Sequence, residues 1–254
     1  MNVIRSLIIA FSMYSKIPMP RCEWNKKSMR YTMCFFPIVG VVIGCVQYFV
    51  GLWCLHTGVS TLFMASVLTI IPVFITGGIH VDGFIDTSDA LHSYQSKERK
   101  LEIMKDPHVG AFAIISTIIY FIASIGIMAE MTRSSLHLVI WGYFVSRTLS
   151  GLSIVLFPCA KNSGLAATFA DGAAKKTTAI ILTIYLSIGI IGIITTNQQI
   201  GWLIGAGVLA FFLYYRNMAK KNFGGITGDL AGWFLQVCEL FIAGMAVIFH
   251  LILR

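Results

Sequence analysis

Seven long apolar runs limit what this chain of 254 residues can fold into more than any other feature. They cover residues 32–55, 60–79, 111–130, 134–158, 177–196, 199–215 and 230–253. A helix of about 20 apolar residues spans the hydrocarbon core of a bilayer. With 57% hydrophobic and only 12% charged residues, the chain lacks the polar surface of a water-soluble domain. We therefore predict an all-α, polytopic membrane helix bundle of about seven spans, with residues 1–254 forming one domain.

Residues 1–20 differ from the apolar runs because they carry Arg5 and Lys16 and end at Pro18 and Pro20. No small-residue cleavage site follows, so we predict an amphipathic or re-entrant helix here and not a signal peptide. The six cysteines form no CxxC pair, which argues against a disulfide scaffold or a zinc site. The composition also excludes a disordered chain, a coiled coil and a nucleic-acid-binding domain.

Lysine and arginine are distributed unevenly among the connections. Of the 19 basic residues, 16 lie in the N-terminal stretch and in the loops 80–110, 159–176 and 216–223. Cytoplasmic loops of membrane proteins are enriched in these residues, so we predict that these segments face the cytoplasm. This asymmetry and the anionic inner leaflet account for the net charge of +8 without a nucleic-acid partner. Most carboxylates fall in the same segments, which suggests a site on that face.

Three aspartates, Asp82, Asp86 and Asp89, follow the second apolar run within GGIHVDGFIDTSD at 77–89. Their spacing of i, i+4 and i+7 places them within about 60° of one helix face. Like charges so close repel unless a cation lies between them, and hard oxygen ligands suit Mg²⁺ or Mn²⁺. We predict a metal site, the alternative being a solvated acidic helix end. His80 falls near the opposite face, where a metal ligand, a supporting contact or a substrate contact remain open.

A second charged segment reads EIMKDPHVG at 102–110. Glu102, Lys105 and Asp106 lie at i, i+3 and i+4, and Pro107 is expected to end their helix. The functional interpretation makes Lys105 a phosphate contact and Asp106 a metal ligand or a base. The alternative is an exposed helix with one salt bridge, which contributes little to stability.

The third segment, FGGITGDLAG at 223–232, is a glycine-rich turn before a predicted helix. Converging backbone N–H groups and a helix N-terminus commonly hold phosphate, although a flexible turn would have the same composition. Asp229 and Glu239 lie on one side of this helix, about 15 Å apart. A carboxylate inside a membrane is costly and marks a candidate functional site. Arg147, inside its own apolar run, is the cation expected to face the acidic interior, and Lys161 begins a polar loop that could bind phosphate or ribose.

Taken together, these segments resemble the cobalamin synthase family, the adenosylcobinamide-GDP ribazoletransferases. The similar segments occur in the family's order: SKIPMP at 15–20, FPIVGVVIG at 36–44, GGIHVDGFIDTSD at 77–89, EIMKDPHVG at 102–110, Ser146-Arg147, Gly164-Leu165 and GGITGDLAG at 224–232. Ala90, Pro107 and Lys161 depart from the family pattern, and none of these departures removes a carboxylate.

The resemblance implies a Mg²⁺-dependent phosphotransferase of the bacterial inner membrane, with its active site facing the cytoplasm. It would join adenosylcobinamide-GDP to α-ribazole, or to its 5′-phosphate, and release GMP in cobalamin biosynthesis. We assign metal binding to Asp82, Asp86, Asp89 and Asp229, and catalysis to Asp82, Asp86, Asp89, Lys105 and Asp106. In these roles Asp89 or Asp106 takes the hydroxyl proton, and Lys105 holds a phosphate oxygen. The residues assigned to substrate binding are His80, Glu102, Arg147, Lys161, Gly224, Gly225, Thr227, Gly228 and Glu239.

A cation-coupled membrane transporter is the competing interpretation. It predicts carboxylates near the bilayer midplane on several helices. Most carboxylates here lie at the ends of the apolar runs, which favours an enzyme, and a structural membrane subunit would not explain their clustering. The expected partners are the two substrates and the lipid bilayer, and the sequence leaves a homo-oligomer open.

Overall fold

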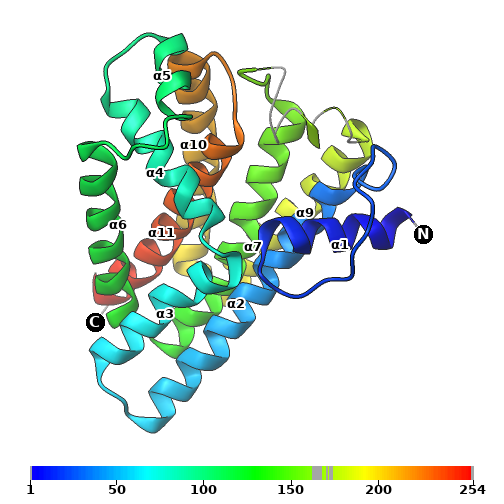
Figure 1. The fold of residues 1–254 in the computed structure, drawn as a ribbon. Coiled ribbons are helices and arrows are strands. Elements are labelled where there is room, and N and C mark those ends of the chain that lie inside the picture. Colours follow the sequence, from blue (N-terminus) through cyan, green and yellow to red (C-terminus); the bar gives the residue numbers. More distant parts are fainter. Residues whose placement is uncertain (1, 162–167, 170, 172–173, 253–254) are drawn as a thin grey trace.

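A computed structural model describes residues 2–161, 168–169, 171 and 174–252, and the elements in this part of the chain are helices (Figure 1). The all-α prediction is therefore confirmed. The helices are α1 (Asn2–Tyr14), α2 (Thr32–Thr57), α3 (Thr61–Thr76), α4 (Ile79–His92), α5 (Lys97–Ile103), α6 (Ala111–Ala129), α7 (Arg133–Leu156), α9 (Lys175–Thr196), α10 (Gln198–Phe223) and α11 (Gly228–Ile252).

Six helices in the described ranges are long and apolar enough to cross a membrane, namely α2, α6, α7, α9, α10 and α11. The most enclosed of them is α7, which packs against α2, α9 and α11. Glycines allow these close contacts: a Cβ atom at Gly40 of α2 would lie 2.3 Å from the Tyr143 carbonyl oxygen. At Gly192 of α9, a Cβ atom would lie 2.3 Å from the Trp141 ring. Small residues commonly mediate such packing in membranes.

The expected span at 60–79 is not one straight helix. The helix α3 has only 16 residues, and the chain then bends by 97° into α4. The bend falls on Gly77 and Gly78, whose φ angles of 67° and 80° lie in the left-handed region that glycine adopts most easily. The total of about seven spans therefore holds if α3 and α4 are taken together as one broken span.

The N-terminal helix α1 runs across the direction of α7 (Figure 1). It is partly buried: Ile9 is fully enclosed, whereas Val3 and Ile4 are exposed. Beyond it, the Lys16 backbone N–H donates to the Ile75 carbonyl oxygen at 2.7 Å and joins the N-terminal segment to the end of α3. This arrangement agrees with the prediction of a short helix outside the main spans.

Two helix boundaries differ from the prediction. Residues 216–223, expected in a loop, continue α10 because the first left-handed residue is Gly224, whose N–H caps the helix on the Lys220 carbonyl oxygen. The helix expected to reach Pro107 ends at Ile103. A proline disfavours helical geometry in the preceding residue, and Asp106 instead accepts a hydrogen bond from the His108 backbone N–H at 2.9 Å.

Candidate active site

The three aspartates at i, i+4 and i+7 lie on the helix α4, as predicted. Asp82 is exposed, and Asp86 and Asp89 are half-buried. Asp86 lies within electrostatic range of the carboxylates of Asp82, Asp89 and Asp229. The structure thus gathers the acidic stripe of α4 and the first turn of α11, which are about 140 residues apart in the sequence.

Two glycines that the sequence analysis did not assign to the site bring α4 and α11 together. A Cβ atom at Gly83 would lie 2.8 Å from the Asp229 carbonyl oxygen and 2.9 Å from its Cα atom. A Cβ atom at Gly232 would lie 3.3 Å from the His80 carbonyl oxygen. The signal in the sequence was a glycine inside an otherwise helical acidic segment, which usually has a packing or functional reason.

The loop before α6 reaches the same stripe. A Cβ atom at Gly110 would lie 2.2 Å and 2.4 Å from the two carboxylate oxygens of Asp89. The segment at 102–110 and the segment at 77–89 therefore meet through this pair of residues. No feature of the sequence indicated that Gly110 would lie against a carboxylate.

Carboxylate oxygens are the right donors for Mg²⁺, but their arrangement leaves coordination positions to other ligands. Within the described residues, no three His, Cys, Asp or Glu side chains converge closely enough to hold a metal ion on their own. Protein Mg²⁺ sites commonly use one or two carboxylates and take their other oxygens from substrate phosphates and water. The stripe fits an ion of that kind, with Asp82, Asp86, Asp89 and Asp229 as the available donors.

Two lysines from different segments lie side by side. Lys161 is near Lys105 and Glu102, and its Nζ atom donates to the Leu101 carbonyl oxygen at 3.4 Å. Burial and, next, the charge of Lys105 lower the pKa of Lys161. Two ammonium groups at such short range favour a bound anion. Residues Asn162 to Leu165, the rest of the predicted polar loop, lie outside the described residues.

The side chains of Asp106 and Glu102 are exposed and do not point into a buried site. The Asp106 side chain is 54% exposed and accepts hydrogen bonds from the His108 backbone N–H and from Nδ1 of the same residue. These bonds lower the pKa of Asp106, so it is a weak base. Glu102 forms an exposed ion pair with Arg99 at 2.7 Å, as the simpler interpretation of this segment predicted.

The glycine-rich segment forms the turn between α10 and α11, and it is fixed to the end of α7. Two of its N–H groups are engaged, since Gly224 donates to Lys220 and Ile226 donates to the Pro158 carbonyl oxygen at 2.9 Å. Thr227 caps α11 by accepting a hydrogen bond from the Leu230 N–H at 3.1 Å. The turn thus holds Asp229 at a helix N-terminus, where the helix dipole favours a negative charge. Fewer of its N–H groups remain for phosphate than the sequence suggested.

Arg147 and Glu239 form a buried ion pair between α7 and α11. Their side chains are 1% and 9% exposed, and Arg147 Nη1 donates to Glu239 Oε1. The same carboxylate oxygen accepts from Ser146 Oγ at 3.1 Å, and the guanidinium group lies over the rings of Phe36 and Tyr143. Removing one partner of such a pair costs about 3–5 kcal/mol. The pair joins α7 to α11 inside the bundle, and substrate contact by either residue stays a prediction.

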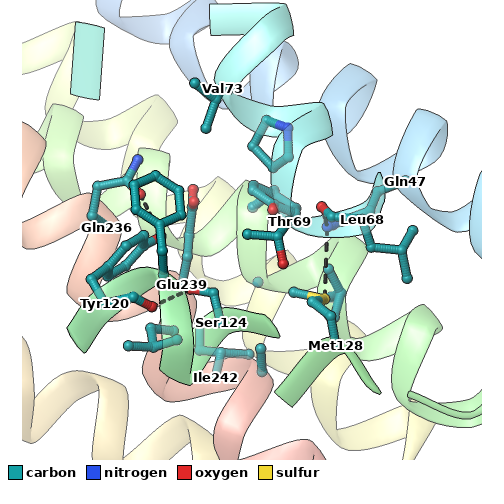
Figure 2. A pocket seen from close by; sticks show the side chains of 17 residues that line it. Gln47, Leu68, Thr69, Val73, Tyr120, Ser124, Met128, Gln236, Glu239 and Ile242 are labelled. Atoms are coloured by element: carbon teal, nitrogen blue, oxygen red, sulfur yellow. Dashed lines mark hydrogen bonds between the residues drawn. The ribbon is translucent and has the colours of Figure 1, made fainter. Parts of the chain in front are cut away.

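Beside this pair lies a cavity of about 40 Å³ (Figure 2). Its polar lining includes Gln47, Tyr120, Gln236 and Glu239, and Tyr120 Oη donates to Gln236 Oε1 at 2.5 Å. A cavity of this size holds water molecules, and its polar lining offers them hydrogen-bond partners.

His80 projects away from the acidic stripe, as predicted. It is 4% exposed, whereas Asp82 of the stripe is exposed. Its ring lies 5.9 Å from the Tyr14 ring and 5.7 Å from the Phe36 ring, measured between centroids. Neither ring nitrogen has a hydrogen-bond partner in the described part of the chain. The histidine therefore connects α4 to α1 and α2, and direct contact with substrate stays a prediction.

Fold and site together define a class: a polytopic helical membrane protein whose carboxylates and lysines gather around α4, α5 and the α10–α11 turn. Comparison with known proteins identifies the family within this class. The family model described as cobalamin-5-phosphate synthase matches residues 6–247. The chain belongs to this family, and it is a transferase of cobalamin biosynthesis.

Individual relatives match over nearly the full chain. An adenosylcobinamide-GDP ribazoletransferase of Lachnoclostridium phytofermentans is 47% identical over 249 residues, which are 98% of this chain and 95% of the relative. One from Clostridium perfringens (strain SM101 / Type A) is 33% identical over 239 residues, covering 92% and 94%. One from Fusobacterium nucleatum is 28% identical over 267 residues, covering 93% and 95%. No solved structure matches the chain.

Proposed function

We propose that this chain is an adenosylcobinamide-GDP ribazoletransferase that requires Mg²⁺. It joins adenosylcobinamide-GDP to α-ribazole, or to its 5′-phosphate, and releases GMP. The observation that carries the proposal is the approach of the α4 stripe to Asp229 through the Gly83 contact. Relatives with the same printed activity cover almost the whole chain, which supports the choice of substrates.

The reaction forms a bond from a ribazole hydroxyl oxygen to a phosphorus of the diphosphate and breaks the bond from that phosphorus to the GMP oxygen. The leaving GMP carries away negative charge, which Mg²⁺ stabilises in phosphoryl transfers. Asp82, Asp86, Asp89 and Asp229 would hold the ion together with diphosphate oxygens. Two residues are proposed to take the hydroxyl proton, Asp89 and Asp106. Asp89 is favoured, because the hydrogen bonds that Asp106 accepts make Asp106 a weak base.

The paired lysines supply the positive charge of the proposed site. Lys105 and Lys161 come from separate loops and lie close together, and Glu102 is the carboxylate that partly offsets the charge around Lys161. A diphosphate or phosphate oxygen between them would relieve the repulsion. Preorganised charges of this kind stabilise the charge that develops in the transition state.

The competing transporter requires carboxylates inside the bundle. Glu239 is the one that the described interior offers, and Arg147 already neutralises it. An ion pair of this kind suits a fixed bundle better than an ion pathway. The distribution of basic residues supports a cytoplasmic active site in a bacterial inner membrane, where nucleotide substrates are available.

The test is GMP release by the purified chain in detergent, with adenosylcobinamide-GDP, α-ribazole or its 5′-phosphate, and Mg²⁺ with or without EDTA. We expect turnover that EDTA abolishes and added Mg²⁺ restores. The variants Asp82→Asn, Asp86→Asn and Asp89→Asn should each lose activity while their melting curves in detergent stay close to wild type. His80→Ala should be milder, because its ring projects from the other face.

A matched control is Glu98→Gln, which replaces an exposed carboxylate on α5 by an amide outside the stripe. It should keep wild-type turnover and wild-type Mg²⁺ dependence. Three active asparagine variants with unchanged Mg²⁺ dependence would refute the metal site. No GMP release under any of these conditions would refute the proposed reaction itself.

A further inference from the structure

A cleft separate from the acidic stripe lies between the end of α7 and the last turns of α10. Its lining includes Phe157, Arg216, Ala219, Lys220 and Gly225. Phe157 follows α7, and the Arg216 guanidinium carbon lies 5.5 Å from the centre of its ring. The cleft therefore has one aromatic wall and two cationic side chains.

Neither cation has an acidic partner in the part of the chain that the structure describes. No ion pair that the structure records in its described ranges includes Arg216 or Lys220. The end of a helix favours a cation, and Lys221 in the same turn meets that need equally well. Helix capping therefore does not explain why Arg216, about one turn earlier, also faces this cleft.

The two cations continue an apolar stripe on α10. Leu209, Leu213, Arg216 and Lys220 are spaced i, i+4, i+7 and i+11, which places them within about 60° of one helix face. Leu209 is 42% exposed and Leu213 is 58% exposed. An amphiphilic ligand along this face would contact hydrocarbon first and positive charge at the end.

The length of α10 indicates where the cationic end of this stripe would lie in a bilayer. Trp202, near the start of α10, is 65% exposed, and tryptophan is enriched where a membrane meets water. The distance along the helix from Trp202 to Lys220 is about 27 Å. The hydrocarbon core measures about 30 Å, so Lys220 is placed near the headgroup level opposite Trp202. Arg216 lies about 6 Å nearer to Trp202, and its long side chain can reach the same level.

We propose that this cleft binds the headgroup of an anionic phospholipid. The phosphate lies between Arg216 and Lys220, and the acyl chains follow Leu209 and Leu213. A soluble phosphate ester shares the charge chemistry, but it would make no use of the exposed leucines. Gly225 forms part of the wall and also abuts the Pro158 carbonyl oxygen, so the bound lipid would brace the turn that carries Asp229.

The experiment measures lipid retention and needs no catalytic activity, so its outcome is independent of the proposed reaction. The chain is reconstituted with equal amounts of phosphatidylglycerol and phosphatidylcholine, washed in detergent, and analysed by native mass spectrometry. We expect one retained phosphatidylglycerol per chain. At about fivefold for each cation near the surface, the double variant Arg216→Gln/Lys220→Gln should lower this preference roughly 30-fold.

Two variants make the result specific. Lys26→Gln/Lys27→Gln removes the same charge from exposed positions elsewhere and should keep the retained lipid. Arg216→Lys/Lys220→Arg keeps both charges and should keep most of the preference. Melting curves in lipid-free detergent control for folding, and exposed positions on a helix tolerate these changes.

Three outcomes would overturn the proposal. Equal retention of phosphatidylcholine would show an apolar surface without headgroup selection. Equal losses in the Arg216/Lys220 and the Lys26/Lys27 variants would show general surface charge. Stabilisation of wild type but not of the Arg216/Lys220 glutamine variant by inorganic phosphate, without retained lipid, would assign the cleft to a soluble phosphate.

Discussion

The substitution Gly110→Ala tests whether the position of the Asp89 carboxylate matters for catalysis. Gly110 has φ −78° and ψ 164°, angles that alanine adopts without strain. The added methyl group would lie 2.2 Å from one carboxylate oxygen of Asp89 and 2.4 Å from the other. A single methyl group thus displaces one carboxylate and changes little else.

The size of the effect follows from this distance. Carbon and oxygen atoms that are not bonded stay about 3.2 Å or more apart, so the carboxylate must move by about 1 Å. A misplacement of 1 Å at a reacting centre can lower the rate about 10²-fold. Stability should change by less than about 1 kcal/mol, because the side chain can rotate away.

The assay is GMP release under saturating Mg²⁺, with a melting curve for each variant. Gly126→Ala is the matched control, since it lies on α6 and a Cβ atom there has no neighbour within 4 Å. We expect Gly126→Ala to behave as wild type. If Gly110→Ala turns over as fast as Gly126→Ala, the carboxylate need not occupy the position that the structure gives it, and its role as ligand or base is refuted.

Three further predictions concern other parts of the site. Lys105→Ala should lower turnover about 10²-fold, because one preorganised charge is lost, and Lys105→Arg should retain only part of the wild-type turnover. Wild-type turnover in the alanine variant would show that Lys105 is an ordinary surface residue. Gly83→Ala should destabilise the chain by about 1–3 kcal/mol in unfolding curves, because backbone atoms of Asp229 block the methyl group; an unchanged curve would contradict the close packing of α4 and α11. A single cysteine in place of the exposed Gln95, in a background without the native cysteines, should react with an impermeant maleimide only after the membrane is opened; labelling of intact cells would place this loop outside.

Local periodicity predicted much of the fold and of the candidate site. The apolar runs gave six long helices, and the spacing of the three aspartates gave their common face on α4. Both follow from the 3.6-residue repeat of a helix, which depends on neighbours in the sequence alone. The resemblance to a known family then gave the segments that belong together, including Asp229.

Contacts between distant segments could not be predicted in this way. Gly83 and Gly110 have no functional side chain, and their role becomes visible only where another segment packs against them. The break between α3 and α4 was hidden because apolar residues continue up to two glycines that a helix can also accommodate. The engagement of the Gly224 and Ile226 N–H groups likewise depends on partners elsewhere in the chain, Pro158 among them.

The ion pair between Arg147 and Glu239 has a consequence for how the chain is made. The two residues are 92 positions apart, so α7 leaves the ribosome long before α11 exists. During that interval α7 carries an arginine near its centre, which costs about 2.5–3.5 kcal/mol on insertion into lipid. The charge is compensated only when α11 arrives with its carboxylate. A chain truncated before α11 would therefore keep an unpaired arginine in the membrane, a feature by which quality-control proteases could distinguish unfinished from finished copies.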